Sequence, residues 1–294
     1  MSEILSRSRA VVLGVVGVAL LLGAWDLYAA FGPDEGVRAG GETYLLPRAD
    51  DTTMPHTWDV VRRLGEPVNA VPGAPDVLRA VVDASTFTLA IAARGFVVGV
   101  LVGLVLALVM SRFRIAESAL LPWIVLSQTV PLIALAPVVR RWGSQIEIAG
   151  QQWTNDQSVA VIAAYLAFFP VAVGALRGLK APDRTHVDLF HAYGVGWWRG
   201  LLALRLPSSV PYLLPALRLA AASAVIGTIV AEVSLGLKGG IGRMFIDYTT
   251  TATSDPAKSF APILGAIAVG LVAAAVVGLI GLLLRPYRPA EATR

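Results

Sequence analysis

The chain has 294 residues, of which 56% are hydrophobic and 15% charged, and its formal net charge at pH 7 is +4. Its mean hydropathy is +0.68, and this apolar excess excludes an ordinary water-soluble domain of that size. The chain has no cysteine, which excludes a disulfide framework and a thiolate metal site.

Six apolar segments are each long enough to cross a hydrocarbon core of about 30 Å, which takes about 20 helical residues. They lack the alternating pattern of outer-membrane strands, so helices are the expected spanning form. The sequence therefore predicts an all-α membrane protein with about six transmembrane helices. The six segments are Ala10 to Phe31, Phe87 to Met110, Ala119 to Val139, Ser158 to Leu176, Val210 to Val233 and Phe260 to Leu284.

The arginine distribution predicts the orientation in the membrane. With the N-terminus inside, most basic residues of the short loops lie in the cytoplasm. We therefore expect a multi-pass protein of a bacterial cytoplasmic (inner) membrane, with both termini cytoplasmic and with membrane lipid rather than nucleic acid as the partner of its positive charge. The residues that carry this expectation are Arg7, Arg9, Arg112, Arg114, those between Arg177 and Arg205, Arg285, Arg288 and Arg294.

Three regions follow along the chain, and we treat 1–294 as a single membrane domain. Residues 1–31 form the first span, which we expect to be retained because no convincing signal-peptide cleavage site follows it. Residues 32–85 form an external segment with two predicted short helices, Thr57 to Leu64 and Pro75 to Val82, the second lying along the membrane surface. Residues 86–294 form the core.

Glycine recurs at every fourth residue of the second span, at Gly95, Gly99 and Gly103. The stripe places three missing side chains on one helix face, so another helix can approach closely. We expect helix packing within the bundle, with a contact between two subunits as the alternative.

The third span is interrupted by Pro122, Pro131 and Pro137, and the carbonyl groups freed at such breaks are tolerated where they face protein or a water-filled cavity. A translocation path and a simple packing kink are both compatible with this pattern. Gln128 is the polar side chain in this span that we expect to touch a solute. In the fifth span, Glu232 is a second path or gate residue, or it braces the external end.

The loop 180–209 reads as a short helix that begins after Pro182 and Asp183 and ends at Gly194. Val187, Phe190 and Tyr193 recur at three-residue spacing, which predicts an apolar stripe on this helix. A second piece, Trp197 to Leu206, leads to Pro207. Ser208 or Ser209 is the expected cap of the next span.

This loop resembles the cytoplasmic signature of permease subunits of binding-protein-dependent ABC importers. That signature has Glu-Ala-Ala, three residues, Gly, nine residues, then Ile, any residue and Leu-Pro. Here Asp188-Leu189-Phe190, Gly194 and Leu204-Arg205-Leu206-Pro207 have the same spacing, with Asp for Glu and with Leu and Phe for the two alanines.

Further matches are similar to the nitrate, sulfonate and taurine branch of these permeases, which includes carriers of thiamine precursors and riboflavin. They cover most of the chain from about Thr88 onward. Residues 144–157 look like an insertion relative to that branch. The matching segments are Gln128 to Pro137 with Gly143, Phe168-Phe169-Pro170, and Ile229 to Glu232 with Gly240 and Gly242.

The resemblance implies a type I ABC importer permease fold with a cytoplasmic coupling helix, translocating a small organic anion or vitamin precursor. It implies docking of ABC ATPase subunits on the loop, an extracytoplasmic solute-binding protein, and a second permease copy in a homodimer or heterodimer. This chain has no phosphate-binding loop and is expected to bind no cofactor and no metal, with ATP and Mg on the partner subunits. The residues concerned are Asp188, Leu189, Phe190, Tyr193, Gly194, Leu206 and Pro207 for coupling, and Gln128, Pro131, Pro137 and Glu232 for the path.

Two other classes of function stay open on the residues alone. An ion-coupled secondary transporter would need no ATPase. An intramembrane enzyme is disfavoured, because the sequence contains no nucleophile elbow and no histidine pair at metal-binding spacing.

Overall fold

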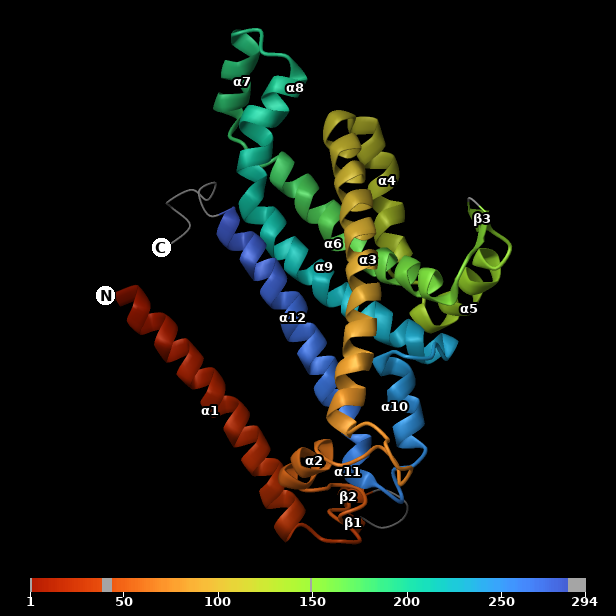
Figure 1. Ribbon diagram of the computed structural model, residues 1–294. Coiled ribbons are helices and arrows are strands. Elements are labelled where there is room, and N and C mark those ends of the chain that lie inside the picture. The colour runs from red at the N-terminus through yellow and green to blue at the C-terminus, as the bar shows by residue number, and fades with distance from the viewer. Residues whose placement is uncertain (1, 39–43, 149, 285–294) are drawn as a thin grey trace. The chain divides into compact units, whose positions relative to one another are not determined.

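The computed structural model describes residues 2–38, 44–148 and 150–284, and Figure 1 shows that helices dominate this part of the chain. Two small antiparallel hairpins are formed by β1 (Val37–Arg38) with β2 (Tyr44–Leu46) and by β3 (Glu147–Ile148) with β4 (Gln151–Gln152). The helices are α1 (Ser2–Phe31), α2 (Thr57–Leu64), α3 (Val77–Arg112), α4 (Arg114–Ser127), α5 (Leu132–Gly143), α6 (Asn155–Leu179), α7 (Arg184–Ala192), α8 (Trp197–Gly200), the π-helical turn η1 (Leu201–Arg205), α9 (Leu206–Leu235), α10 (Ile241–Thr249), α11 (Pro256–Ser259) and α12 (Ala261–Leu283).

Among the described residues, five helical stretches are long and apolar enough to cross a membrane, and six if the bent pair α4 and α5 counts as one span. This confirms the prediction of about six spans. Arg285, Arg288 and Arg294, which the orientation argument used, lie outside the described residues. The stretches are Val12–Phe31, Val77–Arg112, Asn155–Leu179, Trp197–Leu235 and Pro256–Leu283.

The chain divides into two units, Met1–Val82 with Phe245–Leu264, and Asp83–Met244 with Gly265–Arg294. The first unit holds α1, α2 and α11. The second holds α4 to α9, and α3, α10 and α12 run from one unit into the other.

The second unit is built around α6 and α9, which pack through small side chains. Ala163 and Ala167 of α6 and Ala220 and Ala224 of α9 are almost fully buried in one cluster. Small residues let helix backbones approach closely, which is how helices associate in a membrane without a hydrophobic driving force.

The glycine stripe of α3 lies against α6 of the same chain. A Cβ atom added at Gly95, Gly99 or Gly103 would lie 2.4, 2.7 or 2.7 Å from the nearest atoms of α6. Each glycine therefore has a packing role inside the bundle, and the geometry gives the stripe no need of a second subunit.

Proline shapes the elbow between α4 and α5, where the chain bends by 105°. Only Pro131 lies at the break, as the N-cap of α5, whereas Pro122 and Pro137 lie inside helices. Because Pro131 has no N–H, the Ser127 carbonyl lacks its ordinary helical donor. That carbonyl accepts instead from the Val130 N–H at 3.3 Å and from the hydroxyl of Tyr165 on α6.

Two local predictions are corrected by the structure. Residues Pro75 to Val82 do not form a separate surface helix, because α3 begins at Val77 and continues unbroken to Arg112. Ser209 does not cap the following span, since its hydroxyl donates to the Leu206 carbonyl inside a helix that continues from η1. The helix predicted at Thr57 to Leu64 is confirmed as α2.

The described residues of 144–157, the expected insertion, include the paired strands β3 and β4 and the first turn of α6. The indole of Trp153 covers Gly143 at the end of α5, where an added Cβ would lie 2.4 Å from the ring. Its Nε1 donates to the Ser158 hydroxyl at 2.8 Å. The hairpin is thus anchored to the bundle by one tryptophan.

In the first unit, the C-terminal end of α1 holds the following segment through side chains. The Trp25 indole donates to the Pro55 carbonyl at 3.0 Å, and the Tyr28 hydroxyl donates to the Pro47 carbonyl at 2.7 Å. The Asp26 carboxylate accepts from the backbone N–H and the hydroxyl of Thr57, the first residue of α2, at 2.8 and 2.5 Å. A residue of one helix therefore caps the start of another.

Candidate functional site

The helix α7 in the loop 180–209 has strong signals at both ends. At its start, the Asp183 carboxylate accepts from the backbone N–H of Thr185 at 2.8 Å, and this bond lowers the pKa of Asp183. At its end, Gly194 has φ +66°, and the N–H groups of Val195 and Gly194 donate to the carbonyls of Phe190 and His191 at 2.9 and 3.0 Å. This pair of bonds is a Schellman motif, which stops the helix at a defined residue.

The apolar side chains of α7 do not form the single stripe that the sequence predicted. Val187 and Phe190 are half-buried and line a cavity of about 120 Å³ together with Trp197 of α8. Tyr193 is 80% exposed and Leu189 is 51% exposed. Three-residue steps drift by about 60° around a helix, so Tyr193 lies about 120° from Val187 and close to Leu189, four residues before it.

The remaining residues predicted for coupling also divide into exposed side chains and side chains that pack inside the loop. Asp188 is exposed beside Leu189 on α7, and Leu206 and Pro207 begin α9. Phe190 packs toward Gly200 inside the loop, where an added Cβ would meet its ring at 3.9 Å. The outward face of α7 therefore carries Asp188, Leu189 and Tyr193, and Phe190 belongs to the inner face.

The loop continues into α9 without a break in the helix, as Figure 1 shows for α8 and α9. The turn η1 is π-helical, with the N–H of Leu206 donating to the carbonyl of Leu201. Pro207 cannot donate to Ala203, the position four residues earlier, which favours such a local widening. The end of the loop and α9 therefore form one continuous helical stretch.

Three interactions fasten the loop to other helices of the second unit. The Arg112 guanidinium, at the end of α3, lies 5.4 Å from the ring centroid of Trp197. Lys180 forms an ion pair with Glu117 of α4. Arg205 donates to the Leu179 carbonyl at the end of α6 at 3.2 Å. The loop is thus connected to α3, α4 and α6 at once.

Glu232 occupies the other end of α9 and is fully buried. Its carboxylate accepts from the Thr88 hydroxyl of α3 at 2.8 and 3.0 Å and from the Gly242 backbone N–H at 2.9 Å. The Thr88 oxygen in turn accepts from the backbone N–H of Ile241 at 2.9 Å. Glu232 therefore ties α9, α3 and the start of α10 together, which favours the bracing alternative over a side chain that lines a path.

The glycines after α9 leave room for this carboxylate. A Cβ at Gly240 would lie 2.3 Å from the Glu232 carboxyl carbon, and a Cβ at Gly242 would lie 2.5 Å from the Ile229 carbonyl oxygen. Gly239 has φ +99°, a left-handed conformation that favours glycine. The chain turns tightly here, and the glycines of the turn are required by the buried acid beneath them.

The predicted path residues of the third span lie at the elbow. Gln128 is half-buried and donates to the Ser127 hydroxyl at 3.2 Å, and Pro131 and Pro137 are exposed. The α5 side of the elbow packs near the Glu232 end of α9, because Ala136 and Ala231 belong to one buried cluster.

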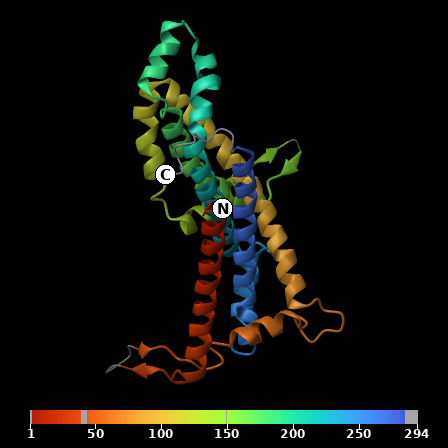
Figure 2. The ribbon, with the colours of Figure 1, turned by 90° about the vertical axis from the view of Figure 1, so that its left-hand side faces the viewer.

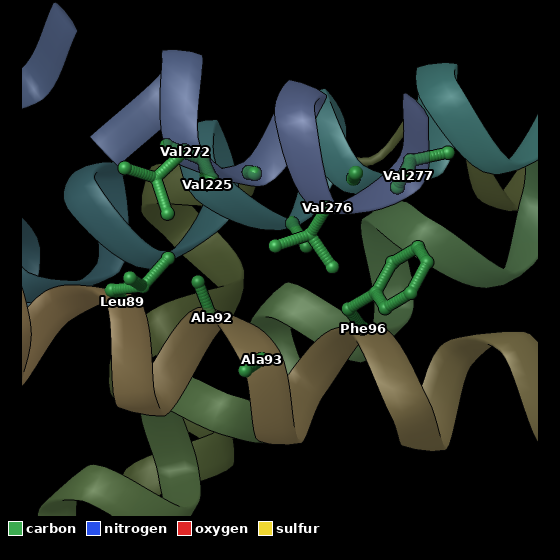
Figure 3. Close-up of a pocket in the computed structure, with 11 residues that line it drawn as sticks. Leu89, Ala92, Ala93, Phe96, Val225, Val272, Val276 and Val277 are labelled. Carbon is green, nitrogen blue, oxygen red and sulfur yellow. The ribbon is translucent and has the colours of Figure 1, made fainter. Parts of the chain in front are cut away.

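A cavity of about 210 Å³ lies between α3, α9 and α12 and is shown in Figure 3. Its walls are hydrocarbon side chains and offer no hydrogen-bonding side chain, so it does not suit a polar solute. The lining residues are Leu89, Ala92, Ala93, Phe96, Ala221, Ala224, Val225, Val272, Ala273, Val276 and Val277.

Several residues that hold the loop, the elbow and Glu232 in place could not be identified from the sequence. Thr88, Tyr165 and Arg112 belong to no motif, and their partners are far away along the chain. Within the described residues, no group of three or more His, Asp or Glu side chains is placed to hold a metal ion.

Comparisons with known proteins assign the chain to a family. Residues 99–286 match the model of the binding-protein-dependent transport system inner membrane component. The chain is 31% identical over 240 residues to the formylaminopyrimidine transport permease protein ThiX of Halalkalibacterium halodurans, covering 79% of this chain and 91% of that protein. It is 27% identical over 134 residues to the riboflavin transport system permease protein RibX of Chloroflexus aurantiacus, covering 46% of each.

The family match covers more than half of the chain, and the apolar helices agree with it. Permeases of this family work with ATPase and solute-binding partners, and they are transport subunits rather than enzymes. The chain therefore belongs to the binding-protein-dependent transport system inner membrane component family and is a multi-pass permease subunit of an ABC importer.

Proposed function

We propose that an ATPase subunit docks on the outward face of α7 and moves α9 through the loop 180–209. The observation that carries this proposal is the arrangement of the loop. Leu189 and Tyr193 are exposed on a helix whose two ends are fixed by Asp183 and Gly194, and the chain then continues into α9 as one helical stretch. Exposed apolar side chains on a rigid element are typical of a docking surface.

Opening and closing of the path would follow from this connection. Docked ATPases that close on nucleotide push α7, and the contacts of Arg112, Lys180 and Arg205 pass the displacement to α3, α4 and α6. ATP and Mg²⁺ would bind to the ATPase subunits, and this chain would bind no cofactor.

A second permease copy would complete the path, as a homodimer or a heterodimer. The α4–α5 elbow presents Pro131 and Pro137 on the surface and keeps Gln128 half-buried beside them. Freed backbone groups at such an elbow suit the wall of a water-filled path between two copies. Glu232 would brace the far end of the path from within the bundle.

The proposed solute is a small organic anion or vitamin precursor, delivered by an external binding protein. The names of ThiX and RibX, which refer to formylaminopyrimidine and riboflavin, support this class. The proposed location is a bacterial inner membrane, with the N-terminus, the loop 180–209 and the C-terminus in the cytoplasm. The excess of arginine in these segments supports this orientation.

The docking proposal can be tested with matched serine variants. Leu189→Ser and Tyr193→Ser should each weaken binding of the ATPase subunit by about thirtyfold, since removing an apolar anchor from an interface costs about 2 kcal/mol. Ile115→Ser is the control, because Ile115 is 85% exposed on α4, outside the loop. Co-purification of the ATPase and uptake into vesicles are the measurements. Normal co-purification with both loop variants would contradict the docking surface.

A further inference from the structure

The helix α2 carries large apolar side chains on its outward face. Trp58 is 56% exposed and Val61 is 65% exposed. Arg62 shares this face, and its side chain is 81% exposed and lies 3.6 Å from the carboxylate of Glu66. Positions 58, 61, 62 and 65 lie on one side of a helix. Val60 and Leu64 lie on the other side and are half-buried.

The position of α2 along α1 fixes its depth in the membrane. Asp26, which caps α2, lies five residues before Phe31, where the apolar stretch Val12–Phe31 ends. At 1.5 Å per residue this is about 8 Å. The stretch has 20 residues, which is about the length needed to cross the hydrocarbon core. The start of α2 is therefore held about 8 Å below the end of this stretch, at the boundary between the hydrocarbon and the lipid headgroups.

The orientation of α2 agrees with this depth. Figures 1 and 2 both show α2 lying across the end of α1 rather than along it. A second attachment holds it there, because Arg63 forms an ion pair with Asp255, just before α11, at 2.8 Å. Its outward face is thus presented at a defined height and angle.

We propose that the face formed by Trp58, Val61 and Arg62 is embedded in the headgroup region of the bilayer. Tryptophan is enriched at this level because its ring is apolar and its N–H is polar. Val61 adds apolar surface, and the long side chain of Arg62 can extend to lipid phosphate groups. A flat amphipathic helix of this kind is buried about 5–10 Å into the interface. The partner of this surface is lipid, and not a protein.

The test uses the absence of cysteine from the chain. A polarity-sensitive fluorophore is attached to Val61→Cys, and to Glu35→Cys as a control in the exposed segment after α1. The labelled full-length chains, with their ATPase subunits, are placed in phospholipid nanodiscs. The lipids carry a nitroxide quencher either near the headgroup or near the end of the acyl chain.

The label at position 61 should fluoresce further to the blue than the label at position 35. It should also be quenched at least about twofold more strongly by the shallow nitroxide than by the deep one, as expected for a helix at the interface. Equal, weak quenching at both positions would place the face in water or against protein and overturn the proposal. Shielding of the label at position 61 that develops only when the solute-binding protein is added would also overturn the proposal.

Discussion

The Thr88 hydroxyl of α3 donates to the Glu232 carboxylate of α9, although 144 residues separate them in the chain. The same hydroxyl oxygen accepts from the N–H of Ile241, and the carboxylate also accepts from the N–H of Gly242. Two helices and the start of a third thus share one small hydrogen-bond network. The Thr88 and Glu232 side chains bond each other, and each also accepts from one backbone N–H group. The removal of either side chain should therefore disturb α3, α9 and the start of α10.

The first prediction concerns this network. Thr88→Val should lower the free energy of unfolding by about 1–3 kcal/mol, because the N–H of Ile241 and the carboxylate of Glu232 each lose a buried partner. Glu232→Gln should cost less, since its amide oxygen can still accept. The double variant should cost less than the sum of the two single variants, because each change weakens or removes the same Thr88–Glu232 hydrogen bond. Intrinsic-fluorescence unfolding in detergent measures this, and strict additivity would show that the network does not act as a unit.

The second prediction concerns the glycines above Glu232. Gly242→Ala should destabilise the protein by about 1–3 kcal/mol, because the new methyl group meets the backbone of α9 and overpacks the site. Gly270→Ala is the matched control, since nothing lies within 4 Å of an added Cβ there. In α12 the control should be neutral, or stabilising by up to about 1 kcal/mol through helix propensity. Equal thermal midpoints for the two variants would refute the packing argument.

The third prediction concerns the end of α7. Gly194 has φ +66°, so Gly194→Ala should cost the loop about 1–2 kcal/mol, and Gly194→Pro should redirect it. Both variants should insert into the membrane normally. Less solute should be taken up for each ATP that the ATPase subunits hydrolyse. Gly196→Ala is a control two residues away, with φ −64° and free space around the added Cβ. Uptake per ATP that is normal in Gly194→Pro would mean that the loop does not transmit the motion.

The fourth prediction concerns the α4–α5 elbow. Tyr165→Phe removes the side-chain donor to the Ser127 carbonyl, which then accepts only from the Val130 N–H at 3.3 Å, and should destabilise the protein by about 0.5–1.5 kcal/mol. In a Pro131→Ala background, the alanine N–H can donate to that carbonyl, so the added cost of Tyr165→Phe should shrink. Thermal unfolding of the four chains gives the coupling energy. The same cost in both backgrounds would show that Tyr165 does not replace the missing proline donor.

The fifth prediction concerns orientation. In intact cells, an impermeant maleimide should label Glu35→Cys, and it should label Thr185→Cys only after the membrane is made permeable. Both positions are exposed, and the chain has no cysteine of its own. Labelling of Thr185→Cys from outside would reverse the proposed topology.

The number and approximate limits of the spanning helices could be predicted from the sequence. A span must satisfy its backbone internally, and its length is fixed by the thickness of the hydrocarbon, so both requirements are visible in local composition. The limits of α7 were equally visible, because Asp183 and Gly194 act on backbone groups within a few residues. The spacing from Gly194 to Pro207 was enough to indicate the family.

The sequence was a poorer guide to which face of each helix packs inward and which points outward. A stripe at three-residue spacing placed Phe190 with Tyr193, but in the structure Phe190 packs toward α8 and Tyr193 points outward. The short helix predicted at Pro75 to Val82 is the first part of α3, since nothing local separates it from the span.

Only the tertiary structure decided which groups the polar residues inside the bundle contact. Glu232 could have lined a path or braced a helix, and its sequence neighbours are the same in both cases. Its role depends on Thr88 and Gly242, which are brought to it by the packing of α3 against α6 and by the turn after α9. The sequence determined which segments are helices and where α7 begins and ends, because those are local properties of the backbone, but it did not give the starts of α3 and α9. Which side chains meet was decided by packing between segments far apart in the chain.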